Sequence, residues 1–379
     1  MKTIASLSSG YGGLEMGLRL AGFDWPTLWH SEIDEHASQV LKTWWPEVPN
    51  LGSFAAPDFW EHAPRASMHV GGIPCQPFSA AGRQRGTEDE RHLWPFWCTG
   101  IELHRPGAVL FENVANLTRG KMRPVFDGIC TDLAALGYDV RWCLLGACAV
   151  GAAHHRHRVF LLARRSAAPD VREVKVQTCG QHAAAYLPTP SAVSYGSNQG
   201  GAAGRTGEVR HSLESMARLE LLPTVTARDA NTRGDVEYQV RRAEAGRTAG
   251  VALGTAVALL PSPRAIDAVR GPAAVDRNEM LGRKNGPDLA QAVQPGMWGK
   301  YAAAIARHEA VLGRSAPEPT EIGPKGGRRL AAAFSEWLMM LPEGHLTSVL
   351  DRNPALARAG NGVVPLQAAT AIRLLLSES

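Results

Sequence analysis

The sequence predicts an α/β fold in which a doubly wound, mostly parallel sheet is joined to a smaller, loop-rich domain. Over residues 1–165, short apolar runs alternate with stretches whose apolar residues recur at helical spacing. From residue 166 to residue 327 this alternation disappears, and Gly, Ala, Arg, Thr and Pro dominate. Since the chain has 379 residues, it is long enough for two domains.

Strands and helices are expected to alternate along the first part of the chain. The expected strands are Thr3–Leu7, Thr27–His30, Met68–Gly71, Ala108–Phe111, Asp139–Leu145 and Arg158–Ala163. The expected helices are Leu14–Leu20, Asp34–Trp44 and one around Val125, Ile129, Leu133 and Leu136, with Gly137 as its C-cap. Such alternation favours parallel strands with helices on both faces of the sheet. Residues 328–379 are expected to be helical again, around the apolar run 337–341.

Composition narrows the class of protein. Hydrophobic residues make up 45% of the chain and charged residues 20%, as in an ordinary globular protein. We expect no membrane association and a cytoplasmic location, because no signal-peptide pattern and no run of about 18 apolar residues occurs. None of the six cysteines forms a Cys-x-x-Cys pair, so neither a disulfide framework nor a zinc site is expected. A net charge of +4 permits a polyanionic partner without requiring one.

A glycine-rich turn, Ser9-Gly10-Tyr11-Gly12-Gly13, follows the first expected strand. Glycines allow a sharp turn and close approach of a ligand to the backbone. Glu32 lies 22 residues beyond Gly10, at the end of the next strand, where a carboxylate can bind a ribose diol. The two features indicate a cofactor that contains adenosine. The alternatives are a plain tight turn and a solvated glutamate.

Cys75 lies in the rigid segment Gly71-Gly72-Ile73-Pro74-Cys75-Gln76-Pro77-Phe78-Ser79, directly after the third expected strand. Ligands of doubly wound sheets bind at the carboxyl ends of such strands. We therefore favour a nucleophilic thiolate over a buried structural thiol. The next residues, 80–91, include Arg83 and Arg85 and predict a mobile basic loop that closes over a polyanion.

Two further clusters of polar residues lie next to expected strands, one directly after a strand and one directly before a strand. Glu112-Asn113-Val114 comes directly after the strand Ala108–Phe111, so the sheet topology should bring Glu112 beside Cys75. In His154-His155-Arg156-His157-Arg158, the histidine spacing matches no common zinc pattern, and we expect no metal. Arg156 and Arg158 are expected to project to one side and to contact a base or a phosphate.

These motifs, in the order in which they occur along the chain, resemble those of the cytosine-5 DNA methyltransferases of bacterial or bacteriophage type. The similar segments are the glycine turn 10–13, Glu32-Ile33-Asp34, Pro74-Cys75-Gln76, Leu93-Trp94, Glu112-Asn113-Val114, Arg156-x-Arg158, Arg328-Arg329-Leu330 with Ser335–Met339, and Gly360–Pro365. The last of these is the motif that returns beside the first in space. Departures are Ser6-Leu7-Ser8 for Asp-Leu-Phe, Ser53 for aspartate and His154 for glutamine. They affect expected cofactor contacts, whereas every residue of the methyl-transfer chemistry matches.

The resemblance implies the fold of S-adenosylmethionine-dependent methyltransferases and transfer of a methyl group to carbon 5 of a flipped-out cytosine. Cys75 would attack carbon 6, and Glu112 would hydrogen-bond to the ring nitrogen or protonate it. Asn113 would shape the pocket, and Arg158, with Arg156 nearby, would hold the base carbonyl. The expected cofactor contacts are Ser9, Gly10, Tyr11, Gly12, Gly13, Glu32, Ile33, Ser53, Pro74, Leu93, Asn361 and Val363. The expected DNA contacts are Gln76, Ser79, Arg83 and Arg85.

The implied layout is a catalytic and cofactor-binding domain over residues 1–165, a target-recognition domain over 166–327 and a C-terminal return over 328–379. The implied partner is double-stranded DNA, with the free protein a monomer in a bacterial or phage-infected cell and a restriction endonuclease as a compatible partner. Two alternatives stay open: an RNA cytosine-5 methyltransferase and a catalytically weak DNA-binding relative. The sequence specifies neither the DNA site nor whether the enzyme is solitary.

Overall fold

The computed structural model describes residues 1–73, 93–165, 177–178, 260, 262–263, 301–324, 326 and 328–377. The chain divides into two compact units. One comprises Met1–Ala183, Leu260–Trp298 and Arg307–Ser379, and the other comprises Ala184–Leu259 and Gly299–Ala306. Nearly all of the described residues belong to the first unit, and the fold below is that of the first unit.

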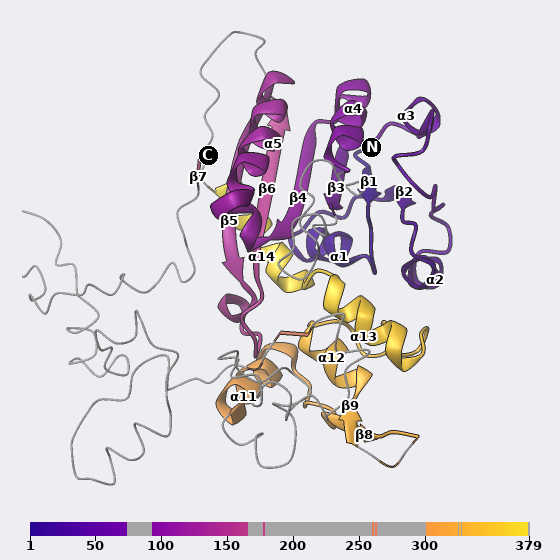
Figure 1. The fold of residues 1–379 in the computed structure, drawn as a ribbon, viewed down its shortest axis with the longest axis vertical. Coiled ribbons are helices and arrows are strands. Elements are labelled where there is room, and N and C mark those ends of the chain that lie inside the picture. Colours follow the sequence, from indigo (N-terminus) through magenta and orange to yellow (C-terminus); the bar gives the residue numbers. More distant parts are fainter. Residues whose placement is uncertain are drawn as a thin grey trace, which may run out of the picture. The chain divides into compact units, whose positions relative to one another are not determined.

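A seven-stranded sheet forms the centre of this unit, with the strand order β2-β1-β3-β4-β6-β5-β7 (Figure 1). The strands are β1 (Ile4–Leu7), β2 (Thr27–Ser31), β3 (Met68–Gly72), β4 (Ala108–Val114), β5 (Tyr138–Gly146), β6 (His157–Arg165) and β7 (Gln177–Thr178). All neighbours pair in parallel except β6, which is antiparallel to both β4 and β5. The predicted α/β fold with a mostly parallel sheet is confirmed.

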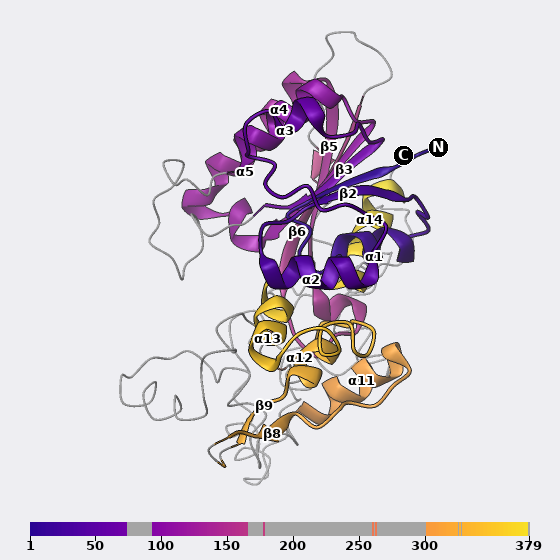
Figure 2. The ribbon, with the colours of Figure 1, turned by 90° about the vertical axis from the view of Figure 1, so that its right-hand side faces the viewer.

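Helices cover both faces of the sheet, as Figures 1 and 2 show. On one face lie α3 (Phe59–His62), α4 (Trp94–His104) and α5 (Arg123–Ala135), and on the other lie α1 (Gly13–Leu20) and α14 (Pro365–Ser377). Side chains alternate between the faces along each strand. In β4, Val109 and Phe111 therefore join the core under α4 and α5, whereas Leu110 joins the core under α1 and α14.

Local sequence explains where the helices begin and end. The Asp34 carboxylate accepts a hydrogen bond of 2.9 Å from the Ala37 amide and caps α2 (Glu35–Trp44). Gly137, with a φ of 83°, follows α5 in the left-handed conformation that the predicted C-cap requires. No described helix has the length and apolar character needed to cross a bilayer.

The C-terminal segment belongs to the same compact unit as the sheet. Its described elements are α11 (Ala302–Leu312, which begins in the second unit), the antiparallel pair β8 (Thr320–Ile322) and β9 (Arg328–Leu330), α12 (Ala332–Leu338), α13 (Arg352–Asn361) and α14. Helix α14 packs closely on α1, because a Cβ atom at Gly17 would stand only 2.6 Å from the Ala368 Cβ. This packing places the chain just before α14 next to the turn that follows β1.

Candidate active site

The turn after β1 leaves its backbone accessible at Gly10. Gly10 and Gly12 adopt left-handed φ values of 57° and 83°. The Gly12 amide donates to the Ser9 carbonyl at 3.0 Å, and the Ser9 hydroxyl donates to the Ser6 carbonyl at 3.0 Å. Among the described residues, no atom outside the turn's own neighbours lies within 4 Å of the place where a Gly10 Cβ would stand. A ligand can therefore approach the Gly10 backbone closely.

Glu32, directly after β2, is joined to this turn. Its Oε2 accepts a hydrogen bond of 2.8 Å from the Gly10 amide, and its Oε1 accepts one of 2.9 Å from the Asp34 amide. Each carboxylate oxygen has a second lone pair, so the group retains capacity for two hydroxyls. Ile33 is 77% exposed, so its apolar side chain is accessible for contact with a flat ring.

Ser53 lies beside the same strand but its hydroxyl takes part in a local turn. The Ser31 hydroxyl of β2 donates to the Gly52 carbonyl and so attaches this loop to the sheet. The Ser53 hydroxyl accepts a hydrogen bond of 3.3 Å from the Ala55 amide. The loop borders the Glu32 side of the site, and the serine offers a hydroxyl there in place of a carboxylate.

The segment between α13 and α14 packs directly on the glycine turn. The buried Tyr11 hydroxyl donates to the Val363 carbonyl at 2.7 Å. A Cβ atom at Gly362 would stand 1.8 Å from the Tyr11 ring, and one at Gly13 would stand 2.6 Å from the Val363 carbonyl oxygen. Asn361, the last residue of α13, is exposed beside them. Residues about 350 positions apart in sequence are thus in contact.

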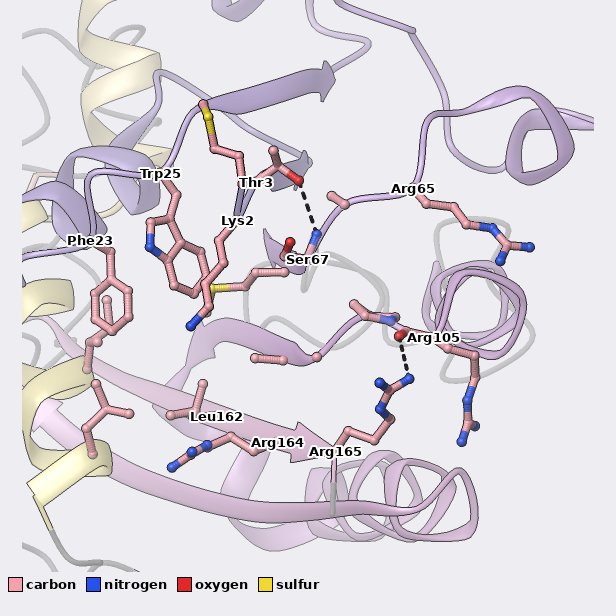
Figure 3. Close-up of a pocket in the computed structure, with 18 residues that line it drawn as sticks. Lys2, Thr3, Phe23, Trp25, Arg65, Ser67, Arg105, Leu162, Arg164 and Arg165 are labelled. Carbon is pink, nitrogen blue, oxygen red and sulfur yellow. Dashed lines mark hydrogen bonds between the residues drawn. The ribbon is translucent and has the colours of Figure 1, made fainter. Parts of the chain in front are cut away.

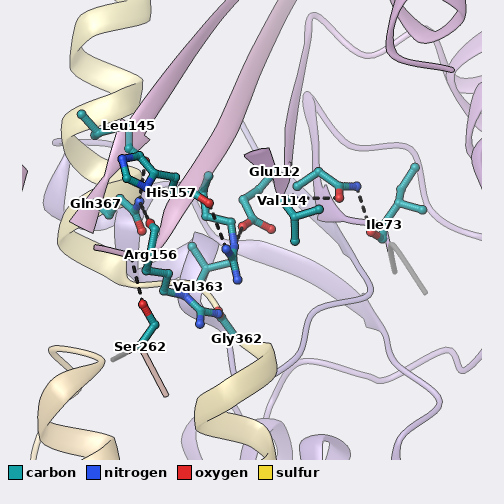
Figure 4. Close-up of polar contacts among 12 residues, drawn as sticks. Ile73, Glu112, Val114, Leu145, Arg156, His157, Ser262, Gly362, Val363 and Gln367 are labelled. Carbon is teal, nitrogen blue, oxygen red and sulfur yellow. Dashed lines mark hydrogen bonds and ion pairs between the residues drawn. The ribbon is translucent and has the colours of Figure 1, made fainter. Parts of the chain in front are cut away.

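Glu112 lies on β4 opposite Gly72, the last residue of β3. Its Oε2 would be 3.1 Å from a Cβ atom at Gly72, and its Oε1 forms an ion pair of 3.0 Å with Nε of Arg158 on β6 (Figure 4). Burial raises the pKa of Glu112 above its usual value, although the nearby charges of Arg158 and Arg156 act to lower it. The carboxyl group therefore retains a proton more readily than an exposed glutamate.

Asn113 holds the chain that leads from β3 toward Cys75. Its Nδ2 donates to the Ile73 carbonyl at 3.0 Å, and its Oδ1 accepts from the Val114 amide at 2.8 Å (Figure 4). Ile73 is two residues before Cys75. The predicted site residues Pro74, Cys75, Gln76, Ser79, Arg83 and Arg85 lie outside the described residues.

Arg156 is buried, with its guanidinium group occupied by backbone carbonyls. It donates to the carbonyls of Pro263 at 3.2 Å, Gly360 at 3.1 Å and Gly362, while its amide donates to the Ser262 hydroxyl at 3.0 Å. Gly360 and Gly362 lie at the C-terminus of α13, where a cation interacts favourably with the helix dipole. Burial, and then the nearby charge of Arg158, lower the pKa of Arg156 to about 9.

The expectation that Arg156 and Arg158 project to one side is wrong. Arg156 has a φ of 31°, outside the extended conformation of a strand, and its side chain extends toward α13 while that of Arg158 contacts Glu112. The sequence also gave no sign of Gln367, which is fully buried in α14. Its Nε2 donates to the carbonyls of Leu145 and Arg156, each at 2.8 Å. A single glutamine within an apolar helix belongs to no sequence motif, so its role could not be predicted.

Two other positions singled out from the sequence, Leu93 and His154, form hydrogen bonds within the fold. Leu93 precedes α4, is half-buried, and accepts a hydrogen bond of 3.2 Å from the Trp97 amide. The ring of His154 is buried and hydrogen-bonds to the Leu338 carbonyl at 2.8 Å. Among the described residues, no group of three His, Cys, Asp or Glu side chains is arranged to hold a metal ion.

Two kinds of chemistry meet at the carboxyl ends of the parallel strands. The Gly10 backbone, the Glu32 carboxylate and the exposed Ile33 form surroundings suited to an adenosine moiety. Beside them, Glu112 is a buried acid paired with an arginine. Asn113 holds Ile73, which lies two residues before the predicted nucleophile Cys75.

Sequence comparisons identify the proteins that this chain is similar to. The family model for C-5 cytosine-specific DNA methylases matches residues 2–214. The Type II methyltransferase M.HgiCII of Herpetosiphon aurantiacus is 33% identical over 160 residues, which are 41% of this chain and 36% of that protein. The Type II methyltransferase M.NgoMIV of Neisseria gonorrhoeae is 33% identical over 164 residues, which are 43% and 52% of the two chains. The chain thus matches about a third to a half of the length of these relatives.

Solved structures resemble the chain in fold. The S. pombe Dnmt2 methyltransferase has a TM-score of 0.50 and 13% identity, with 100% of this chain and 99% of that chain covered. The Entamoeba histolytica methyltransferase EhMeth has a TM-score of 0.50 and 11% identity, with 100% and 98% covered. At these identities the likeness concerns the fold alone. Because the family model covers more than half of the 379 residues, the chain belongs to the C-5 cytosine-specific DNA methylase family.

Proposed function

We propose that the protein transfers a methyl group from S-adenosylmethionine to carbon 5 of a cytosine flipped out of a specific double-stranded DNA sequence, with Cys75 as the covalent nucleophile. The observation that carries this proposal is the cluster of Glu112, Arg158 and Asn113. Glu112 is a buried acid and Arg158 is the cation paired with it. The Asn113 side-chain amide holds Ile73, from which the chain continues to Cys75. Membership of the family supports the same activity.

The described residues fit S-adenosylmethionine. Glu32 has lone pairs left for the two ribose hydroxyls, and Ile33 offers an apolar surface to adenine. The open backbone at Gly10 leaves room for the amino-acid part of the cofactor. The other proposed contacts are Ser9, Tyr11, Gly12, Gly13, Ser53, Pro74, Leu93, Asn361 and Val363. When bound, the cofactor supplies an electrophilic methyl group.

The residues of this chain would make the cytosine reactive. The Cys75 thiolate adds to carbon 6, and the ring electrons that it displaces are accepted as Glu112 donates its proton to the ring nitrogen. Carbon 5 then becomes nucleophilic. Arg158 keeps Glu112 in place and binds the base carbonyl, and Asn113 limits the pocket. Once carbon 5 carries the methyl group, the ring nitrogen returns its proton to Glu112, and loss of the carbon 5 proton to a water molecule breaks the bond to sulfur, releases the Cys75 thiolate and restores the ring.

DNA would be held by parts of the chain outside this cluster. We propose Gln76, Ser79, Arg83 and Arg85 as contacts near the flipped base, and residues 166–327 as the region that selects the sequence. Residues 1–165 and 328–379 would together form the catalytic domain. Unstacking the target base costs a few kcal/mol, which contacts in the pocket would offset. Because Type II methyltransferases are among the similar proteins, we propose a restriction endonuclease as a partner. We also propose that the free enzyme is a monomer.

Bisulfite sequencing of a plasmid from expressing cells tests the activity. We expect 5-methylcytosine in one sequence context for the native chain and none for Cys75→Ala. Calorimetry with S-adenosylmethionine and a duplex binding titration serve as controls that Cys75→Ala is folded. If the native chain binds both ligands but leaves DNA unmethylated, the proposed activity is wrong, and an RNA substrate would then be tested directly.

A further inference from the structure

A pocket lies at the amino ends of the parallel strands, on the side of the sheet away from the candidate active site. It has a volume of about 670 Å³ and is formed by the segments that enter β1, β3 and β4, the end of β6 and one side of α14 (Figure 3). The glycine turn, Glu32 and Glu112 all lie at or near the carboxyl ends of the parallel strands. The pocket is therefore separate from the site proposed for methyl transfer.

The charged side chains that line this pocket are all basic. They are Lys2, Arg65, Arg105, Arg164 and Arg165, and no aspartate or glutamate is among the lining residues. None of the five forms an ion pair with a described acidic side chain. Lys2 lies 5.1 Å from the centre of the Trp25 ring, and Arg165 donates to the Arg105 carbonyl at 3.1 Å. Within the described part of the chain, these positive charges therefore have no acidic side chain paired with them.

One wall of the pocket is apolar. Phe23 and Trp25 meet edge to face with ring centres 5.2 Å apart, and Figure 3 shows Lys2 and Arg164 ending on their side of the pocket. Ser67 and Thr3 add hydroxyl groups. Volumes of roughly 300–1,000 Å³ are typical of sites for small ligands. Clustered cations beside aromatic rings are suited to a molecule that carries both phosphates and a flat ring.

We propose that this pocket binds a small phosphorylated ligand of nucleotide size. Lys2 and Arg164 would hold its phosphates, and the wall of Phe23 and Trp25 would contact its ring. This proposal does not rest on the methyltransferase activity. The competing explanation is a basic surface that attracts the DNA backbone without a defined site, and it predicts a different result for short anions.

Calorimetry with inorganic tripolyphosphate and with guanosine triphosphate tests the proposal. S-adenosylhomocysteine is kept saturating so that neither probe is measured at the cofactor site, and guanosine triphosphate is chosen because it contains neither adenosine nor cytosine. We expect both probes to bind, guanosine triphosphate more tightly. Lys2→Gln with Arg164→Gln should weaken both by about tenfold or more, since two charge-assisted contacts are lost.

The matched control is Lys42→Gln with Arg123→Gln, which removes two positive charges outside the pocket and should change affinity less than about twofold. Arg164→Lys, which keeps the charge, should bind nearly as the native chain does. Failure of tripolyphosphate to bind at low ionic strength would overturn the proposal. So would equal weakening by the two double variants, or a loss of duplex DNA affinity in the pocket variant as large as its loss for tripolyphosphate. If guanosine triphosphate bound no more tightly than tripolyphosphate, the nucleotide assignment would be wrong.

Discussion

At the residue scale, two opposing effects determine the pKa of Glu112. Removing a carboxylate from water favours its protonated form, whereas Arg158 at 3.0 Å favours the charged form. Burial has the larger effect, so the pKa of Glu112 is raised. An acid in this balance holds its proton more readily than an exposed glutamate, and once it has donated that proton it is stabilised as a carboxylate by the same arginine.

Replacing Glu112 by glutamine tests this role. Glu112→Gln keeps the shape and a hydrogen-bond donor but cannot release a proton to the base. We expect the single-turnover methylation rate to fall by roughly 10²–10⁴, with little change in S-adenosylmethionine affinity. Rapid-quench assays and calorimetry measure the two quantities. A rate within about threefold of the native value would contradict general acid catalysis by Glu112.

Arg156 is better described as a positioning residue than as a catalytic one. Its guanidinium joins the carbonyls of Pro263, Gly360 and Gly362, and Gly362 supports Tyr11 of the glycine turn. Arg156→Gln should lower the free energy of unfolding by about 2–4 kcal/mol, because buried carbonyls lose their donors, and should also weaken cofactor binding. Urea denaturation and calorimetry check both effects.

Arg158→Lys provides the comparison for Arg156→Gln. The charge beside Glu112 is kept, so cofactor affinity should stay near the native value while the methylation rate falls. If Arg156→Gln instead slowed methylation with unchanged stability and unchanged cofactor affinity, a direct contact with the base would be favoured over the positioning role.

At the scale of elements, periodic apolar patterns were sufficient to predict the six longer strands and helices α1, α2 and α5 to within a few residues. Helix α4 was missed because its apolar residues are not confined to one side, since the buried Trp94, Trp97 and Ile101 share the helix with exposed Phe96 and Leu103. The reversed direction of β6 could not be predicted either. Pairing direction depends on tertiary connections, and the alternation of β6 side chains is the same in both directions.

Parts of the candidate site could be anticipated where a motif lies at the end of a strand or just after it, because the carboxyl ends of parallel strands converge. Glu112, Asn113 and Glu32 are examples. Arg156 and Gln367 were misjudged or missed, since their partners are backbone carbonyls from distant segments. Spacing along the chain carries no information about such partners.

The contact between the glycine turn and the segment after α13 gives a prediction at this scale. A methyl group at Gly362 would collide with the Tyr11 ring at 1.8 Å, and that ring is buried. We expect Gly362→Ala to lower the free energy of unfolding by about 1–3 kcal/mol and to weaken S-adenosylmethionine binding. Chemical denaturation and calorimetry measure these effects.

Gly128→Ala is the matched control for Gly362→Ala. Gly128 lies within α5, and no atom lies within 4 Å of its Cβ position. Alanine there should raise the free energy of unfolding by about 0.5–1 kcal/mol, since glycine is the poorer helix former. Unchanged cofactor affinity in Gly362→Ala would show that the segment after α13 does not support the glycine turn.

At the scale of the whole unit, fully buried neutral histidines connect stability to pH. His69, His154 and His308 come from β3, the chain before β6 and α11, and all three are inaccessible to solvent. Burial lowers the pKa of His69 and His154 to about 3 and that of His308 to about 4. His69 lies between Trp60 and His104, with ring centres 5.5 and 5.6 Å away, in surroundings that cannot solvate a cation.

These shifts determine the sign of the pH dependence. Between about pH 6.5 and pH 4 the unfolded chain binds protons at the three histidines and the folded chain does not. The free energy of unfolding is therefore highest above about pH 6.5 and falls as the pH is lowered, by on the order of 4 kcal/mol at pH 5.5 if the three act independently. Glu112, whose pKa is raised, acts in the opposite direction, but it is one group against three.

Urea denaturation at several pH values checks this, with variants that separate buried from exposed histidines. His69→Phe removes one titrating group while preserving the aromatic packing on Trp60, so its stability should fall less steeply than that of the native chain between pH 6.5 and 5.5, by about 1 kcal/mol. His36→Gln, at an exposed position of α2, should leave the slope unchanged. Equal slopes for the native chain and His69→Phe would mean that His69 takes up its proton in the folded state, and the buried histidines would then not account for acid sensitivity.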